Sequence, residues 1–313
     1  MLRLIARRIV TMVPTLLGVV LISMLLLDLM PGDPAAIIAG DQATPQAIAA
    51  VRHDLRLDEP LWVRGAGYLW GLAHGDLGTS PGGHIPVWSR ISVALPVTLS
   101  LCLLGMVLGL ALGILAGTYA ALRRGRLLDR VIVATASVAQ AVPPFVLGLG
   151  LVIALAVDRP WFPVSGYVPL TENPQQWFVH LVLPSTALAL SVAAEIARQT
   201  RGALIDTLEQ DFIRAGRAKG LSEFRLIGKH AAKNTAIPVV TVTGLQVARI
   251  LAGAVVVERI FGLNGFGSLA VNAVLSRDVV LIQGVVLVSA TFVLITNLLV
   301  DLSYGYLNPK VRA

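Results

Sequence analysis

Residues 96–121 read PVTLSLCLLGMVLGLALGILAGTYAA, a run in which no residue is charged. A helix needs about 20 mostly apolar residues to cross about 30 Å of hydrocarbon, so this run is long enough to span a bilayer. Glycine recurs at every fourth position in it, at Gly105, Gly109, Gly113 and Gly117. Positions four apart share one face of a helix, so this glycine stripe predicts close packing against another helix.

The rest of the chain has the same apolar character. Of its 313 residues, 56% are hydrophobic and 14% are charged, whereas about 25% of an average soluble domain is charged. Six stretches are long and apolar enough to cross a membrane, and we place them at residues 9–30, 96–121, 131–157, 179–199, 236–258 and 279–300. We therefore predict an all-α polytopic membrane protein with six transmembrane helices. The first stretch is too long for the apolar region of a cleaved signal peptide, so it is predicted to be retained.

Several residues within these stretches carry predictions of their own. Pro143 and Pro144 predict a bend in the third span, because proline removes a backbone donor and clashes with the preceding turn. Three amides are predicted to form hydrogen bonds between helices, with contact to a substrate as the alternative: Gln140, Gln283 and Asn297. Glu195 and Arg198 are three residues apart, which predicts an ion pair within one helix.

The basic residues indicate the orientation of the chain in the membrane. Six spans place both termini on one side, and seventeen of the 25 Lys and Arg residues fall on that side. Cytoplasmic loops carry the excess of basic residues, so we predict that both termini are cytoplasmic. The formal charge of +7 is dispersed among the spans rather than gathered in one patch, which does not indicate nucleic-acid binding.

The predicted organisation has three parts. Residues 1–30 form the first span, residues 31–95 an extracytoplasmic segment, and residues 96–313 a core with a cytoplasmic loop at 201–235. In the segment, Thr44 and Pro45 suit the cap and first position of a helix, and a second helix is expected after Pro60. Residues 75–83 read as turns. This segment is a candidate receiver for an extracytoplasmic partner.

The cytoplasmic loop has the stop and start signals of two helices joined by a turn. Gly220 suits the left-handed position that ends a helix, and Ser222 suits the cap of the next one, with Glu223 in its first turn. Leu221 and Leu226 are spaced to form a hydrophobic staple. The pattern predicts a rigid protrusion, although an amphipathic helix on the lipid surface is the alternative.

One face of the fifth span is polar, since Thr243, Gln246 and Arg249 are three residues apart. A charge at the membrane centre costs about 2.5 to 3.5 kcal/mol on insertion scales, so Arg249 is expected to face water, substrate or an acidic partner. We interpret the stripe as part of a translocation path in which Arg249 attracts a carboxylate or a carbonyl of the substrate as it passes. The alternative is a structural pairing of Arg249 with an acid or carbonyl of this chain or a neighbour.

No sequence pattern for catalysis is present. The chain has no phosphate-binding Gly-x-x-x-x-Gly-Lys-Ser/Thr loop, no His-Glu-x-x-His pattern and one cysteine, Cys102. We therefore expect no ATPase of its own, no metal site and no bound cofactor. One possible function is that of a secondary transporter or channel driven by an ion gradient. Such proteins favour acidic residues at mid-depth in the membrane, but no acidic residue lies near the centre of a predicted span. A second possible function is that of an intramembrane enzyme. That function requires a nucleophile and a base on facing helices, and the sequence shows no such pair.

A resemblance to a known family adds to these patterns. Arg214-Ala215-Gly216, Gly220 and Ile237-Pro238 resemble the Glu-Ala-Ala, Gly and Leu-Pro positions of the loop that importer permeases of the ATP-binding-cassette (ABC) class insert into their ATPases. The family's usual Glu is Arg214 here. Four further stretches are similar to the B-type subunit of the dipeptide and oligopeptide permease family: residues 31–34, 75–80, 95–99 and 258–261. At residues 262–267 the match is weaker, because Asn264 lies where that family more often has a Pro-Gly-x-Gly turn.

The resemblance implies a type I ABC importer in the inner membrane that carries dipeptides or oligopeptides by alternating access. It implies as partners a second, C-type permease, one or two ATPase subunits that bind ATP and Mg²⁺, an extracytoplasmic solute-binding protein and membrane lipid. Nickel complexes, glutathione, haem or sugars are alternative cargoes in the same family. The predicted coupling residues are Arg214, Ala215, Gly216, Arg217, Ala218, Lys219, Gly220, Leu221 and Ser222. The predicted docking residues for the solute-binding protein are Asp76, Gly78, Glu258 and Asn264.

Overall fold

A computed structural model describes residues 2–28, 33–40, 43–80 and 85–307. Several predictions lie outside these residues: the end of the first span at 29–30, the motif residues Pro31 and Gly32, the turn residues Pro81, Gly82 and Gly83, and the basic residues Lys310 and Arg312. The chain divides into two compact units. We call Val97–Leu263 with the chain from Thr296 onward the central unit, and Leu2–Pro96 with Asn264–Ile295 the flanking unit.

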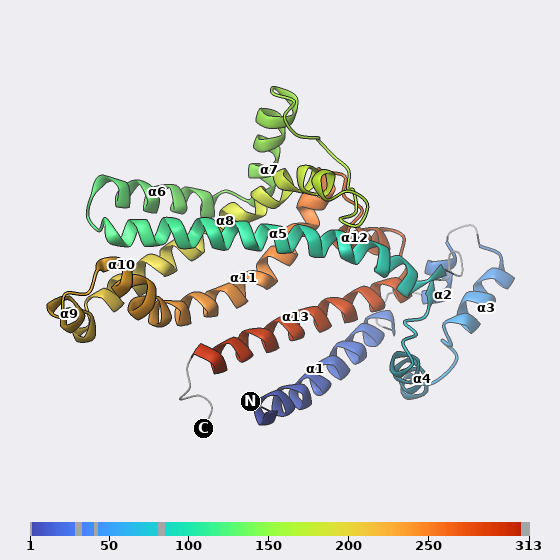
Figure 1. Ribbon diagram of the computed structural model, residues 1–313. Helices are drawn as coiled ribbons and strands as arrows, with labels where there is room; N and C mark the ends of the chain where they lie inside the picture. Colours follow the sequence, from blue (N-terminus) through green and yellow to red (C-terminus); the bar gives the residue numbers. More distant parts are fainter. Residues whose placement is uncertain (1, 29–32, 41–42, 81–84, 308–313) are drawn as a thin grey trace. The chain divides into compact units, whose positions relative to one another are not determined.

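The described secondary structure is helical apart from one short hairpin (Figure 1). The flanking unit contains α1 (Leu2–Asp28), α2 (Pro34–Ala39), α3 (Pro45–Asp54), α4 (Leu61–Ala73), β1 (Thr79–Ser80), β2 (Ile85–Pro86) and α12 (Phe266–Leu275). The central unit contains α6 (Leu127–Ala141), α7 (Pro144–Val152), the π-helix η1 (Ile153–Val157), α8 (Pro174–Leu208), α9 (Asp211–Ala218), α10 (Glu223–Arg225), the π-helix η2 (Leu226–Ala231) and α11 (Ala232–Ile260). Two long helices contribute to both units: α5 (Val87–Leu122) and α13 (Val279–Leu307).

Helix α8 organises the central unit and contacts α6, α7 and α11. It also packs on the glycine stripe of α5, as the sequence predicts. A β-carbon at Gly113 would lie 2.7 Å from Ile196 Cβ, and one at Gly117 would lie 2.4 Å from the Ala197 carbonyl oxygen. Such distances are too short for any larger residue, so the absence of side chains lets the two backbones approach.

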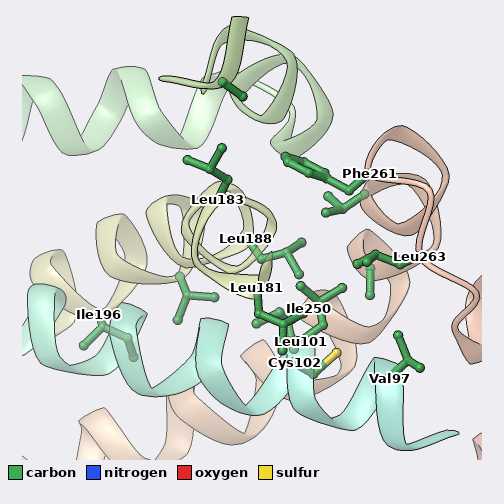
Figure 2. Close-up of a cluster of buried hydrophobic side chains, with 14 of the residues drawn as sticks. Val97, Leu101, Cys102, Leu181, Leu183, Leu188, Ile196, Ile250, Phe261 and Leu263 are labelled. Atoms are coloured by element: carbon green, nitrogen blue, oxygen red, sulfur yellow. The ribbon is translucent and has the colours of Figure 1, made fainter. Parts of the chain in front are cut away.

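The buried side chains of the central unit surround α8. Figure 2 shows Leu181, Leu183 and Leu188 of α8 close to Ile250 and Phe261 from the α11 end of the unit, and these belong to one cluster of buried residues. Leu181 and Phe261 are almost wholly inaccessible. Lipid tails are as apolar as these side chains, so close packing rather than removal from water stabilises the contact within a membrane.

The third predicted span is not one straight helix. Helices α6 and α7 meet at a bend of 100°, and the break falls at Val142 and Pro143, directly before the start of α7 at Pro144. The predicted bend is confirmed, and it divides residues 131–157 into separate helical segments. Exposed backbone polar groups at such a break must find partners in protein or water when they lie at membrane depth.

The flanking unit confirms the local predictions for its first helices. Thr44 Oγ1 accepts a hydrogen bond of 3.2 Å from the Ala47 amide, and Pro45 occupies the first position of α3. Helix α4 begins directly after Pro60. A separate apolar cluster joins α5, α12 and α13 within this unit, and it includes Ile91, Phe266 and Leu281.

The structure supports the membrane assignment without confirming six spans. Among the residues that the structure describes, four helical stretches are long and apolar enough to cross a bilayer, and the bent pair of α6 with α7–η1 makes up to five. The described apolar part of α1, Val10–Leu25, is shorter than the length required for that class. The predicted division into residues 1–30, 31–95 and 96–313 stays a prediction, since 264–295 group with the flanking unit here.

Candidate functional site

The turn after α9 has the geometry that the sequence predicts. Gly220 has φ = 75°, the left-handed region in which glycine is favoured. The amide of Leu221 donates to the Gly216 carbonyl over 3.2 Å, and the amide of Gly220 donates to the Arg217 carbonyl over 2.9 Å. These two bonds form a Schellman motif, which satisfies the last carbonyls of the helix and fixes the direction in which the chain leaves it.

Apolar contacts hold this turn on the ends of longer helices. Ile213 of α9 is fully buried in a cluster with Ala121, Leu204 and Ala231. A β-carbon at Gly216 would lie 2.5 Å from Leu226 Cδ2 and 3.5 Å from Leu221 Cδ1. Both leucines of the predicted staple therefore lie against Gly216, and α9 cannot easily rotate relative to the helix that follows.

An ion pair also connects the two sides of the turn. Arg217 Nε lies 2.7 Å from Glu223 Oε1, and Arg217 Nη2 lies 3.2 Å from Glu223 Oε2. Hydrogen bonding to this carboxylate raises the pKa of the Arg217 guanidinium. Ser222 precedes the first helical residue as predicted, but its side chain makes no capping hydrogen bond. The Arg217–Glu223 pair, rather than a side-chain cap, is the polar side-chain contact that connects α9 to the start of α10.

The outward surface of the turn is accessible. The exposed residues include Arg214, Ala215, Ala218, Lys219 and Gly220, and Arg214 lies at a long distance of 3.4 Å from Asp211. Two exposed aromatic residues accompany them and were not identified from the sequence: Phe212, with 44% exposure, and Phe224, with 89%. A large apolar side chain in a highly charged, protruding loop is the signal that would have identified them. We call the exposed surface of Phe212, Ala215, Lys219 and Phe224 the coupling face.

Two of the three predicted path residues line one cavity of about 220 Å³ in the central unit. Gln246 and Arg249 of α11 line it together with Gln140 of α6 and Ser191 of α8. Gln246 is buried and Arg249 is exposed. Thr243 does not line this cavity, and its hydroxyl donates to the Val239 carbonyl over 2.8 Å. Its path role stays a prediction.

The predicted docking residues differ in their accessibility. Asp76 is exposed and accepts a hydrogen bond of 2.8 Å from the Gly78 amide, and Asn264 is exposed as well. Gly78 has φ = 86°, and a β-carbon there would lie 2.8 Å from Val280 Cγ1, so the position requires glycine. Glu258, in contrast, is fully buried in the central unit and accepts a hydrogen bond from Thr98. A surface contact through the Glu258 carboxylate is not available in this arrangement.

The structure adds an ionic contact that the sequence did not indicate. Asp129 of α6 is 3% exposed, and Arg201 of α8 binds it through two bonds of 2.5 and 2.8 Å. The Gly125 amide donates to the same carboxylate over 2.8 Å. Arg124, which precedes Gly125 in the chain, pairs with Glu209 over 2.5 Å. These contacts join α6 and the 123–126 turn to α8 and its C-cap, Glu209, next to the segment that carries the coupling face.

Two predicted polar contacts are confirmed. Gln140 Nε2 donates to Glu195 over 2.5 Å, which joins α6 to α8, and Arg198 pairs with Glu195 within α8. Gln283 is 8% exposed and lines a cavity in the flanking unit. Within the described ranges, no group of three or more His, Cys, Asp or Glu side chains gathers as a metal site.

Two family models match the chain. Residues 109–313 match the family described as "Binding-protein-dependent transport system inner membrane component", and residues 1–102 match the N-terminal part of such membrane components. The chain therefore belongs to the family of inner-membrane components of binding-protein-dependent transport systems. This assignment confirms that the chain is an ABC transporter permease and that it is a component of the inner membrane.

Named relatives cover the chain almost completely. A putative peptide transport system permease protein of Brucella abortus is 39% identical over 309 residues, which are 99% of this chain and 98% of that protein. The dipeptide transport system permease protein DppB of Escherichia coli K12 is 37% identical over 336 aligned residues, covering 100% of this chain and 99% of DppB. A probable peptide ABC transporter permease of Sinorhizobium fredii is 40% identical over 309 residues, covering 98% of each chain.

Solved structures show the same fold at low sequence identity. A chain of the MetNI methionine ABC transporter, solved in inward-facing conformations, has a TM-score of 0.58 at 14% identity and covers 71% of this chain and 97% of its own. A chain of an amino acid ABC transporter solved with histidines has a TM-score of 0.51 at 16% identity, covering 70% of this chain and 94% of its own. The predicted type I ABC importer fold is thereby confirmed.

Proposed function

We propose that this chain is one of two permease subunits of an ATP-driven importer that moves dipeptides or short oligopeptides into the cytoplasm. Relatives named for peptide and dipeptide transport align over nearly the full length of both chains, which supports peptide as the cargo class. The observation that carries the coupling role is the fixed turn at Gly220, because a rigid protrusion transmits movement between subunits.

The coupling face is the proposed contact with a separate ATPase subunit. The exposed Phe224 side chain is suited to insert into a pocket of the ATPase subunit, because aromatic residues buried at an interface contribute much of its affinity. Ile213 anchors the turn on α8, so a displacement of the coupling face moves the inner end of that helix. ATP and Mg²⁺ bind to the partner subunits in this proposal, and this chain holds neither.

The cavity lined by Gln140, Ser191, Gln246 and Arg249 is the proposed contact with cargo. Arg249 supplies a guanidinium for a peptide carboxylate, and the two amides and the hydroxyl supply hydrogen bonds to peptide groups. The bend between α6 and α7 brings Pro144 into the same lining, so movement at this bend alters the cavity. Alternating access then opens the path to either side.

On the outer side, the solute-binding protein is proposed to dock through the exposed Asp76 and Asn264. The rigid turn at Gly78 holds Asp76 in place, and Glu258 contributes from inside the fold by anchoring α11 to α5 through Thr98. Both termini are proposed to be cytoplasmic, as the distribution of basic residues indicates.

Purification of the tagged chain in mild detergent tests this proposal directly. We expect a second permease and an ATPase with a phosphate-binding loop to co-purify, and the preparation to hydrolyse ATP. The variant Phe224→Glu is expected to lose the ATPase subunit but keep the second permease, whereas Phe178→Glu, at an exposed aromatic residue outside the coupling face, is the matched control. Recovery of the ATPase with Phe224→Glu would contradict the assigned contact.

A further inference from the structure

The flanking unit contains a cavity of about 440 Å³ that is separate from the proposed cargo path, although Asp76 in its lining is also a proposed docking residue. Its walls come from α1, the end of α3, α4, the turn before β1 and the start of α13. Its polar lining comprises Asp54, Arg56, Arg64, Tyr68, Asp76, Thr79 and Gln283. A concave site with a few converging polar groups is the usual form of a small-molecule site.

One face of α4 forms the centre of this lining. Arg64, Gly67, Tyr68 and Gly71 follow the i, i+3, i+4, i+7 spacing that places residues on a single helical face. The two glycines admit groups from outside the helix. A β-carbon at Gly67 would lie 3.2 Å from Arg56 Nη1, and one at Gly71 would lie 3.3 Å from the Asp76 carbonyl oxygen. The Arg56 guanidinium and the backbone of Asp76 thus approach α4 one helical turn apart, about 6 Å along the axis.

Three charged side chains at this cavity, those of Asp54, Arg56 and Asp76, form no ion pair with another described residue. Within the part of the chain that the structure describes, Asp54 and Arg56 have no ion-pair partner, and Asp76 accepts a hydrogen bond only from the Gly78 amide. Arg64 is 8% exposed.

Tyr68 adds a polar group without a hydrogen bond. Its hydroxyl is buried and has no hydrogen-bond partner among the described residues. Burial and the nearby Asp76 carboxylate raise the pKa of Tyr68 to about 12, so the hydroxyl keeps its proton and remains a donor. Native proteins rarely leave such a group unsatisfied, and a bound ligand is one way to satisfy it.

We propose that this cavity binds a small zwitterion, an unblocked dipeptide or a free amino acid, with its carboxylate toward Arg56 and Arg64 and its ammonium group toward Asp76 and Asp54. Guanidinium groups bind carboxylates through paired hydrogen bonds. A β-carbon at Gly71 would lie 3.8 Å from Asp76 Cβ, so the Asp76 side chain begins about one helical turn from the Arg56 contact, and two extended residues span about 7 Å. The cavity lies within the flanking unit, whereas Gln246 and Arg249 lie in the central unit. The site therefore does not rest on the transport role proposed above.

Equilibrium dialysis of labelled L-alanyl-L-alanine against the purified complex, without the solute-binding protein, tests this site. We expect saturable binding that free alanine competes for and that N-acetyl-alanyl-alanine amide, which has neither terminal charge, does not. Loss of a hydrogen bond to a charged group weakens binding about tenfold or more, so Arg56→Gln and Asp76→Asn are expected to raise the Kd by at least that factor.

Matched controls separate the site from general effects of charge and from the path. Arg277 is an exposed arginine with φ = 55°, close to the 52° of Arg56, and it does not line the cavity, so Arg277→Gln is expected to leave the Kd unchanged. Asp58→Asn is the equivalent control for Asp76. If Arg56→Gln does not fold, Asp54→Asn and Tyr68→Phe provide the same test. Absence of saturable binding to the unmodified complex, or binding that only Arg249→Gln reduces, would overturn the proposal.

Discussion

Arg217 and Glu223 bind each other across the turn at Gly220, through two hydrogen bonds of 2.7 and 3.2 Å. Their side chains are 46% and 58% exposed, and exposed ion pairs contribute at most about 1 kcal/mol to stability. The pair therefore matters more for the angle between α9 and α10 than for the stability of the fold. Together with the contact between Gly216 and Leu226, it makes the coupling face a single rigid surface.

The left-handed glycine of this turn provides a sharp test. Gly220→Ala is expected to cost about 1 to 2 kcal/mol locally, because φ = 75° brings a β-carbon close to the backbone carbonyl. We expect ATP hydrolysis by the complex to lose its stimulation by cargo-loaded binding protein, while the chain still folds. Gly228→Ala is the control, since its β-carbon would meet no atom within 4 Å and its φ is not positive. Equal effects of the two substitutions would count against a special role of the turn.

The glycine stripe of α5 predicts a difference between two glycines. Gly117→Ala places a β-carbon 2.4 Å from the Ala197 carbonyl oxygen, and such overpacking costs about 1 to 3 kcal/mol. Gly202→Ala on α8 meets no atom within 4 Å and is expected to be neutral or stabilising by up to about 1 kcal/mol from helix propensity. Thermal unfolding in detergent is the measurement. A lower midpoint for Gly202→Ala than for Gly117→Ala would refute the packing argument.

The Asp129–Arg201 pair is expected to contribute more than an exposed ion pair. Asp129 is almost wholly buried, so Arg201→Gln leaves its carboxylate without its two charged donors, at a cost of about 2 to 3 kcal/mol. Arg198→Gln removes a pair whose guanidinium is 41% exposed, and a cost below about 1 kcal/mol is expected. A double-mutant cycle of Arg201→Gln with Asp129→Asn measures the coupling, and additive single effects would show that the pair contributes nothing.

Arg249 is expected to act on transport rather than on folding. Arg249→Gln is expected to reduce peptide uptake about tenfold or more, because a charge-assisted hydrogen bond to the cargo carboxylate is lost. Arg249→Lys keeps the charge and is expected to retain part of the uptake. Assembly with the partner subunits, measured by co-purification, serves as the control. Normal uptake by a correctly assembled Arg249→Gln complex would assign Arg249 a structural role instead.

The sequence was most informative where a local rule applies. Glycine spacing in α5, the Pro143–Pro144 break, the start of α3 at Thr44 and the left-handed Gly220 each depend on neighbouring positions in the chain, and all four are observed. The expected Ser222 side-chain cap is absent, and the contact that the local pattern did not indicate is the pairing of Arg217 with Glu223, the first residue of the next helix.

Contacts between distant residues could not be predicted in this way. Asp129 and Arg201 are 72 residues apart, and nothing in the local pattern of either stretch indicates that they meet. Periodicity identified the polar face of α11, but only the packing of α6 and α8 shows that Gln246 and Arg249 share a cavity and that Thr243 does not line it. Glu258 has a charged side chain of the kind that usually lies at the surface, but here it is buried and accepts a hydrogen bond from Thr98.

The most direct test of the account is the uptake of a labelled tripeptide into liposomes. The liposomes contain this chain with its co-purified subunits, with the solute-binding protein outside and ATP enclosed or omitted. We predict uptake that requires enclosed ATP and that disappears with Phe224→Glu while the permease pair stays assembled. Uptake by this chain alone in liposomes without ATP would contradict the account.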